Sequence, residues 1–114
     1  MGKMVSGSRR VVVVLVTCPT RTAARKVANR LIGSRLAACV NLIPSIESTF
    51  RWQGKTERCR EALLLIKTTA RRFEALKRAI LTLHPYQVPE IIAVSLAAGH
   101  QPYLDWVASS ASSP

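Results

Sequence analysis

The sequence lacks the long apolar segments of a membrane protein. No apolar run approaches the roughly 18 residues that a membrane-spanning helix needs. Residues 11–16, VVVVLV, follow two arginines and loosely imitate a signal peptide. The run is short for a signal core, however, and no small-residue cleavage site follows it. We therefore expect a chain without a transmembrane segment, in which residues 11–16 form a buried strand.

Cysteines are few and widely spaced, at Cys18, Cys39 and Cys59. They form no CxxC pair and no Cys–His ladder, so a structural zinc site is not indicated, and free thiols fit a reducing compartment. The sequence also has no Ser-His-Asp set, no phosphate-binding glycine loop and no paired carboxylates from which an enzyme mechanism could be built. These absences predict a non-enzymatic, cytoplasmic protein.

Acidic residues are scarce, with 6 against 17 lysines and arginines, which gives a net charge of +11. This excess makes a nucleic acid or another polyanion a partner to consider. RNA-recognition modules stack bases on aromatic residues of their central strands, whereas all six aromatics of this chain lie outside the central strand cores. We therefore expect no specific nucleic-acid site, and we interpret the basic residues as solvated helix faces with incidental, salt-sensitive polyanion binding.

The apolar residues recur with the periods of regular secondary structure. Residues 11–17 are β-branched and apolar, as in a strand, and Thr20 or Thr22 can cap a helix that ends near Gly33. Residues 36–67 are typical of a long, bent hairpin with a glycine turn at residues 53–55.

The second half of the chain repeats the alternation of helix and strand. A second helix is expected to begin at Thr68 or Thr69 and to end before Pro85, which lacks the N–H that a helix interior needs. Residues 91–96 form the last core strand, and a short helix with Pro102 near its first position follows.

This order, β-α-β-β-α-β plus a C-terminal helix, predicts an α+β fold of the ferredoxin-like class, with an antiparallel sheet and the long helices on one face. We expect a single domain over residues 11–108, with flexible termini at residues 1–10 and 109–114. Gly2 matches a permissive acylation pattern, which we interpret as an arbitrary start of the chain.

The strands are apolar on both sides. A sheet with one wet face should alternate apolar and polar residues, but VVVVLV, LLLI and IIAV do not alternate. Two helices can cover only one face of the sheet. The other face would expose on the order of ten apolar side chains, each worth roughly 1.5–3 kcal/mol on complete burial. We therefore expect this face to be buried against another copy of the chain.

Several residues could carry chemistry. His84 has no second metal-ligating residue at helical spacing, so its simplest role is at the carbonyl end of the second helix. Tyr86 and Glu90 each bring a polar tip into a segment stiffened by two prolines. Cys39 would need a neighbouring cation to become reactive, and Lys67 could supply it if the strand register brings the two together.

The sequence allows two roles for each of its tryptophans, packing or ligand binding. Trp52 precedes the glycine turn, where a tryptophan is usually a packing or interface residue, although it could also close a ligand pocket. Trp106 and Tyr103 give the terminal helix an apolar side, for which packing is the simpler explanation.

Six motifs together resemble the CutA divalent-cation tolerance family: VTCPT, RLAACVNLIPSIES, WQGK, LLIKT, HPYQVPEIIAV and YLDWV. The resemblance covers residues 11–107, and the wording of the first two motifs is closer to animal members. It implies a ferredoxin-like subunit in a tight homotrimer, similar in shape to PII signalling proteins. It also implies an inter-subunit cleft for a metal or small ligand, lined by positions that correspond to Cys39, Trp52, Lys67, Tyr86, Glu90 and Trp106, with His84 as a metal ligand.

The resemblance implies an association with copper tolerance, but the chain departs from the bacterial copper pattern. Bacterial members are proposed to use a strand cysteine and a His-His pair, where this chain has Val16 and Leu83–His84. Cys18, two residues along the same strand face, is a substitute to consider. We therefore predict weak binding of copper or another divalent cation that is not required for folding. The resemblance also offers an alternative, a scaffold for anchoring or processing an acetylcholinesterase-type enzyme.

Overall fold

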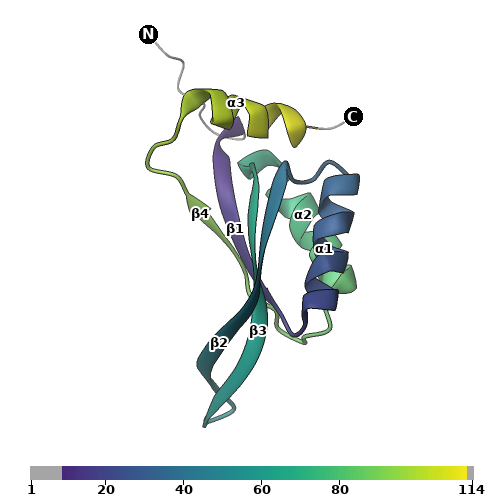
Figure 1. Cartoon of the computed structure of the whole chain (residues 1–114), viewed down its shortest axis with the longest axis vertical. Helices are drawn as coiled ribbons and strands as arrows, with labels where there is room; N and C mark the ends of the chain where they lie inside the picture. The colour runs from purple at the N-terminus through teal and green to yellow at the C-terminus, as the bar shows by residue number, and fades with distance from the viewer. Residues whose placement is uncertain (1–8, 113–114) are drawn as a thin grey trace.

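The computed structural model describes residues 9–112 and shows a four-stranded antiparallel sheet with two long helices packed on one face (Figure 1). The strands lie in the order β2-β3-β1-β4. This confirms the predicted α+β, ferredoxin-like class. The elements in chain order are β1 (Val11–Cys18), α1 (Arg21–Gly33), β2 (Cys39–Trp52), β3 (Lys55–Thr69), η2 (Ala70–Arg72), α2 (Phe73–Leu83), β4 (Ile91–Ser95) and α3 (Gln101–Ser110). The acylation motif at Gly2 lies outside the described residues.

The two long helices begin differently. The hydroxyl of Thr20 accepts a hydrogen bond of 3.0 Å from the backbone N–H of Ala23, so Thr20 is the N-cap of α1, as expected. The second helix was expected to begin at Thr68 or Thr69, but both residues still belong to β3, and α2 begins only at Phe73. Thr69 is the N-cap residue of the short helix η2, without a side-chain cap bond. The Thr68 hydroxyl donates to the carbonyl of Leu36 at 2.7 Å, and the short helix η2 separates β3 from α2.

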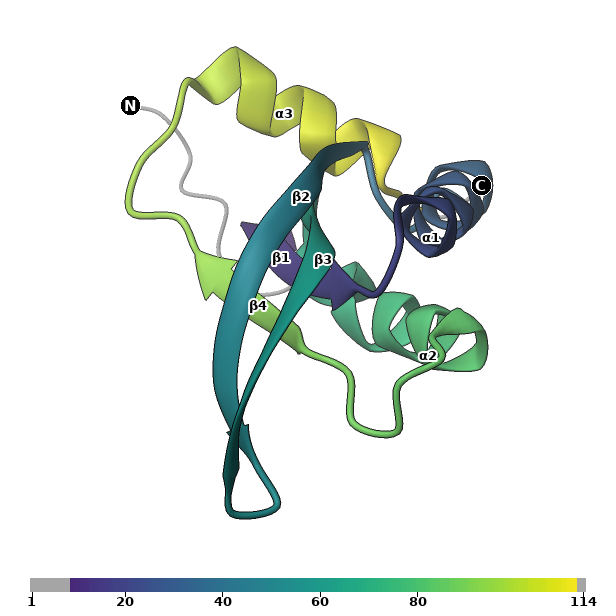
Figure 2. The same cartoon turned by 60° about the horizontal axis from the view of Figure 1, so that its bottom comes forward.

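The β2–β3 hairpin is long and projects beyond the helices (Figure 2). Its two-residue turn has Gln53 at φ 50° and Gly54 at φ 79°, the left-handed pair that matches the twist of a hairpin. The register shifts between Ile43 and Ile46, where Pro44 cannot donate a ladder hydrogen bond. The hairpin thus has a half that runs beside β1 and a half that projects freely.

The inner face of the sheet, which faces α1 and α2, forms the core. Alternate residues of β1 and β3 are completely buried there, including Val14, Val16, Leu64 and Ile66. Residues of the two helices at i, i+3 and i+7 spacing pack onto them, for example Ala24, Val27 and Leu31 of α1.

Among residues 9–112, no layer of helices covers the outer face of the sheet in this way. Strand registers place Leu15 opposite both Leu65 and Ile92, and Val13 opposite Val94, so these side chains share the outer face. Ile92 and Val94 remain 50% and 46% exposed. We define the outer apolar face as Val13, Leu15, Ile43, Leu63, Leu65, Ile92 and Val94.

Helix α3 crosses the end of the sheet at which β1 begins (Figure 1). Val107 and Ala111 are fully buried, and the Arg35 side chain donates to the carbonyl of Ser112 at 3.2 Å. The packed chain therefore continues past residue 108, the end expected from the sequence, because the apolar side of α3 extends to Ala111.

Candidate functional site

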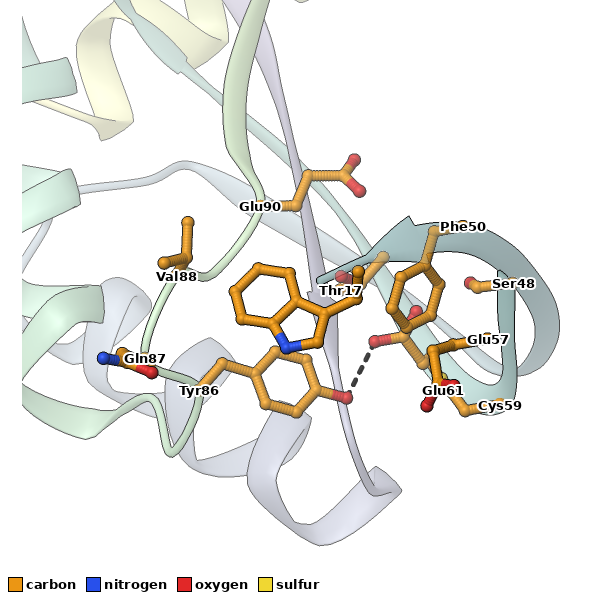
Figure 3. Close-up of a pocket in the computed structure, with 11 residues that line it drawn as sticks. Thr17, Ser48, Phe50, Glu57, Cys59, Glu61, Tyr86, Gln87, Val88 and Glu90 are labelled. Carbon is orange, nitrogen blue, oxygen red and sulfur yellow. Dashed lines mark hydrogen bonds between the residues drawn. The ribbon is translucent and has the colours of Figure 1, made fainter. Parts of the chain in front are cut away.

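A pocket of about 510 Å³ lies where the segment between α2 and β4 meets the projecting hairpin (Figure 3). Its walls come from the end of β1, from both hairpin strands and from residues 86–90. Because the register pairs Ser48 with Cys59 and Phe50 with Glu57, these hairpin side chains share one face, which continues the outer apolar face past the shift at Pro44. The lining residues are Thr17, Ser48, Phe50, Trp52, Glu57, Cys59, Glu61, Tyr86, Gln87, Val88 and Glu90.

His84 fixes the segment that carries one wall of the pocket. It is the C-cap residue of α2, and its buried ring is held by two backbone bonds. Nδ1 accepts the N–H of Tyr86 at 3.1 Å, so Nε2 carries the proton and donates to the Thr17 carbonyl at 2.6 Å. Both ring nitrogens are thus engaged, and a metal ion at His84 would have to displace one of these bonds.

Tyr86 connects this segment to the hairpin. Its hydroxyl donates to Oε2 of Glu61 at 2.8 Å (Figure 3). Its ring lies 4.8 Å from the ring of His84, centroid to centroid. Burial, the hydrogen bond to Glu61 and the charge of Glu61 together raise the pKa of the Tyr86 hydroxyl far above its usual range. Tyr86 is therefore a neutral donor at physiological pH, and it holds the carboxylate in place.

The thiols near Glu61 are also held in the protonated state. Burial, followed by the charge of Glu61, raises the pKa of Cys18 from 9.0 to about 11. The same causes, together with the charge of Glu57, raise the pKa of Cys59. Since a thiolate rather than a thiol binds metal, Cys18 is a poor substitute for the missing copper ligand at Val16. The sulfur of Cys18 is in addition fully buried in the core.

The predicted cleft residues fall into two groups. Trp52, Tyr86 and Glu90 line the pocket together. Cys39 and Lys67 pair directly in the β2–β3 register, about six residues from Glu61 along β3. That separation is roughly 20 Å at 3.3 Å per residue. Within one chain the two groups are therefore separate sites.

The second group lies beneath α3. Lys67 is next to Cys39 in register, as the sequence suggested, but its ammonium donates to Oδ1 of Asn41. Burial raises the pKa of the Tyr103 hydroxyl, and contact with Cys39 adds to that shift. The ring of Trp106 lies 5.6 Å from that of Tyr103, centroid to centroid. Trp106 therefore belongs to this end of the sheet, away from the pocket.

The sequence reasoning missed most of the polar wall of the pocket. Glu57, Cys59 and Glu61 alternate along β3, where the register pairs Glu57 with Phe50 and Cys59 with Ser48. The period of two was the available signal, since it assigns Ser48, Phe50 and Trp52 to one side of the strand. What the sequence did not show was that the shift at Pro44 aligns this side with the outer face.

The described residues 9–112 contain no group of three or more histidine, cysteine or acidic side chains arranged to hold a metal ion. Within the same range, no helix is both long and apolar enough to cross a membrane.

The sequence is similar to a known protein family and to several of its members. The family model "CutA1 divalent ion tolerance protein" matches residues 12–110. A relative from Thermus thermophilus, "Divalent-cation tolerance protein CutA", is 50% identical over 95 residues, which are 83% of this chain and 92% of the relative. Human "Protein CutA" is 46% identical over 92 residues, which are 81% of this chain but 51% of the human protein.

Solved structures show the same fold. The divalent cation tolerance protein of Thermus thermophilus matches with a TM-score of 0.83 at 48% identity, covering 85% of this chain and 94% of that chain. A protein described as periplasmic, CutA from Archaeoglobus fulgidus, matches with a TM-score of 0.86 at 31% identity, covering 90% and 99%. The family resemblance of the sequence motifs is thus confirmed: the chain belongs to the CutA1 divalent ion tolerance protein family.

Proposed function

We propose that the protein is a non-enzymatic homotrimer that contributes to divalent-cation tolerance by binding a metal ion or small ligand weakly in clefts between its subunits. The outer apolar face carries this proposal. Three of its seven side chains, Ile43, Ile92 and Val94, are 38%, 50% and 46% exposed, and the other four are partly buried. Each would therefore gain only part of the roughly 1.5–3 kcal/mol that complete burial is worth, and closing three copies around each other would supply that burial.

Such an assembly would also give a role to the two separated groups of cleft residues. The pocket with Trp52, Tyr86 and Glu90 and the cluster of Cys39, Lys67 and Trp106 lie at opposite ends of the same strands. Both ends adjoin the outer apolar face. A neighbouring subunit packed on that face would bring its pocket close to the Cys39, Lys67 and Trp106 cluster of the first subunit. We therefore place the cleft between subunits.

Within this proposal, a divalent cation such as copper would bind only weakly at the carboxylates of the pocket, such as Glu90, because residues 9–112 contain no group of three or more ligands arranged to hold it. His84 would join it only by giving up one of its backbone bonds. The free state of Cys18, Cys39 and Cys59 supports a reducing, cytoplasmic setting for this function.

Equilibrium dialysis against Cu²⁺ tests the metal component. Binding to the wild type and to Glu90→Gln is compared with binding to the control Glu47→Gln. Glu47 lies on the β2–β3 hairpin, and its side chain does not line the pocket. We expect weak wild-type binding, a loss in Glu90→Gln and no change in Glu47→Gln. His84→Ala is included with its fold checked by circular dichroism, since His84 is buried. Negligible binding by the wild type would remove metal binding from the proposal.

The basic helix faces favour a second, weaker activity. Helix α1 carries Arg21, Arg25, Lys26 and Arg30 with no acidic residue, and the one acid of α2, Glu74, is paired with Lys77 at 3.0 Å. We expect heparin or RNA to bind this helical layer at low salt. Binding that vanishes at physiological salt and ignores sequence would mark it as incidental.

A further inference from the structure

The charged residues that line the pocket are acidic, although the chain as a whole is strongly basic. The chain has 17 basic and 6 acidic residues, yet none of the lysines and arginines among residues 9–112 lines the pocket. Three of the six acids do: Glu57, Glu61 and Glu90. In a strongly basic protein this is a local field of the opposite sign, and it favours a positively charged occupant.

Glu61 gives a second and independent indication of such an occupant. Its side chain is buried, with 7% of the residue exposed, and it accepts a hydrogen bond from the neutral Tyr86 hydroxyl. Among residues 9–112 the one ion pair joins Lys77 and Glu74, so no basic side chain of the described chain neutralises Glu61. Buried carboxylates are normally paired with a cation, because removing an unpaired charge from water is costly.

The rest of the wall is aromatic and apolar. Phe50, Trp52 and Tyr86 come from β2 and from the segment after α2, and Val88 adds an aliphatic surface. Phe50 and Trp52 are each 42% exposed, so parts of their rings are available to a ligand. Aromatic faces attract cations through the ring quadrupole, and a planar guanidinium can stack on a ring while it pairs with carboxylates.

The size of the pocket separates an organic cation from a bare metal ion. A metal ion needs several ligands converging at about 2–2.6 Å, and the described residues offer no such group. The three carboxylates are instead distributed around about 510 Å³, a volume typical of small-molecule sites. We propose that this pocket binds a small organic cation of the guanidinium or alkylammonium type, with its charge at the carboxylates and its apolar part against the aromatic wall. This inference names the ligand class for the pocket end of the cleft, and thus rests in part on the proposed function.

Titration with n-butylguanidinium chloride at constant ionic strength tests the proposal, and n-butylurea serves as the neutral probe of nearly the same shape. Binding is followed by isothermal titration calorimetry on the wild-type chain, so that Trp106, a residue of the proposed cleft, is left unchanged. We expect saturable binding of n-butylguanidinium with a Kd of roughly 1 mM or lower, and binding of n-butylurea at least about tenfold weaker.

Charge-neutralising variants identify the groups that bind the cation. Glu57→Gln and Glu90→Gln should each weaken binding of n-butylguanidinium by about threefold; the effect is modest because both residues are exposed and water screens their interactions. Glu47→Gln removes an equal charge from the opposite face of β2 and should leave binding unchanged. Equal binding of the two probes, or equal effects of Glu47→Gln and Glu90→Gln, would overturn the proposal.

The oligomer mass is measured on the same samples, so this inference and the proposed function fail in different ways. A trimer that binds Cu²⁺ but not n-butylguanidinium overturns only the organic-cation assignment. If the probe does not bind and Glu57→Gln weakens the assembly, a basic side chain of another copy fills the pocket, which also overturns it. A monomer that binds the probe contradicts the trimer and supports the pocket, because all its lining residues belong to one chain.

Discussion

The two faces of the sheet are built from the same strands, and they differ in what covers them. On the inner face, Val14, Val16, Leu64 and Ile66 are fully buried by helices of the same chain. On the outer face, Leu15 and Leu65 alternate with these residues and are partly exposed, and Ile92 and Val94 of β4 are about half exposed. Burial of the inner face thus stabilises the fold of a single chain. The outer face is as apolar as a core, but a single chain leaves part of it exposed to water.

The two faces should differ most in their response to a charged residue placed on only one of them. Ile92 on the outer face and Leu81 on the helical layer are both 50% exposed, so an aspartate at either position should cost a single folded chain little. In the proposed trimer, Ile92→Asp would bury a carboxylate without a partner in each subunit, at a cost of several kcal/mol per charge. We expect Ile92→Asp to yield folded monomers and Leu81→Asp to leave the trimer intact, as measured by light scattering. Equal behaviour of the two variants would contradict the account.

A second contrast uses adjacent leucines of β3. Leu64 is fully buried on the inner face, so Leu64→Ala should lower the free energy of unfolding by about 2–5 kcal/mol. Leu65 lies on the outer face, and in the monomeric Ile92→Asp background Leu65→Ala should cost less than about 1.5 kcal/mol. Urea denaturation in that background measures both values. A similar loss for both variants would mean that the monomer itself buries its outer face.

Most of this contrast was predictable from the sequence, because it depends on the period of two in the strands. VVVVLV and LLLI have no polar alternation, which predicted apolar side chains on both faces before any contact was known. The caps and stops of the helices were predictable to within a few residues, apart from η2. There the Thr68 hydroxyl binds the Leu36 carbonyl, a contact between residues far apart in sequence.

The candidate site was only partly predictable from the sequence, because it too depends on contacts between residues far apart in the chain. Trp52, Tyr86 and Glu90 were recognised from their motifs, and the pocket brings them together. Glu61 was not recognised, because its burial depends on the Tyr86 hydroxyl, 25 positions away, and on the register shift at Pro44. In the proposed trimer, the distance from Cys39 and Lys67 to the pocket would depend on a second chain, and a single sequence does not predict that distance.

The smallest of the expected effects is a pH dependence that originates in the core. The folded chain holds the pKa of Cys18 at about 11, above its ordinary value of 9.0, so the folded state binds more protons than the unfolded state between these values. This contribution to stability is complete below about pH 9 and is lost as the pH rises through about 11. Urea denaturation from pH 8 to 10.5 should show a shallower decline for Cys18→Ala than for the wild type. Parallel declines would contradict the assignment.

Sedimentation equilibrium of the wild-type protein at micromolar concentration tests the central claim most directly. If the outer apolar face is the inner surface of a homotrimer, the particle should have three times the chain mass of 12.5 kDa, and this mass should persist on dilution through the micromolar range. A folded and soluble particle of 12.5 kDa under the same conditions would contradict the account, because the outer apolar face would then be stable in contact with water.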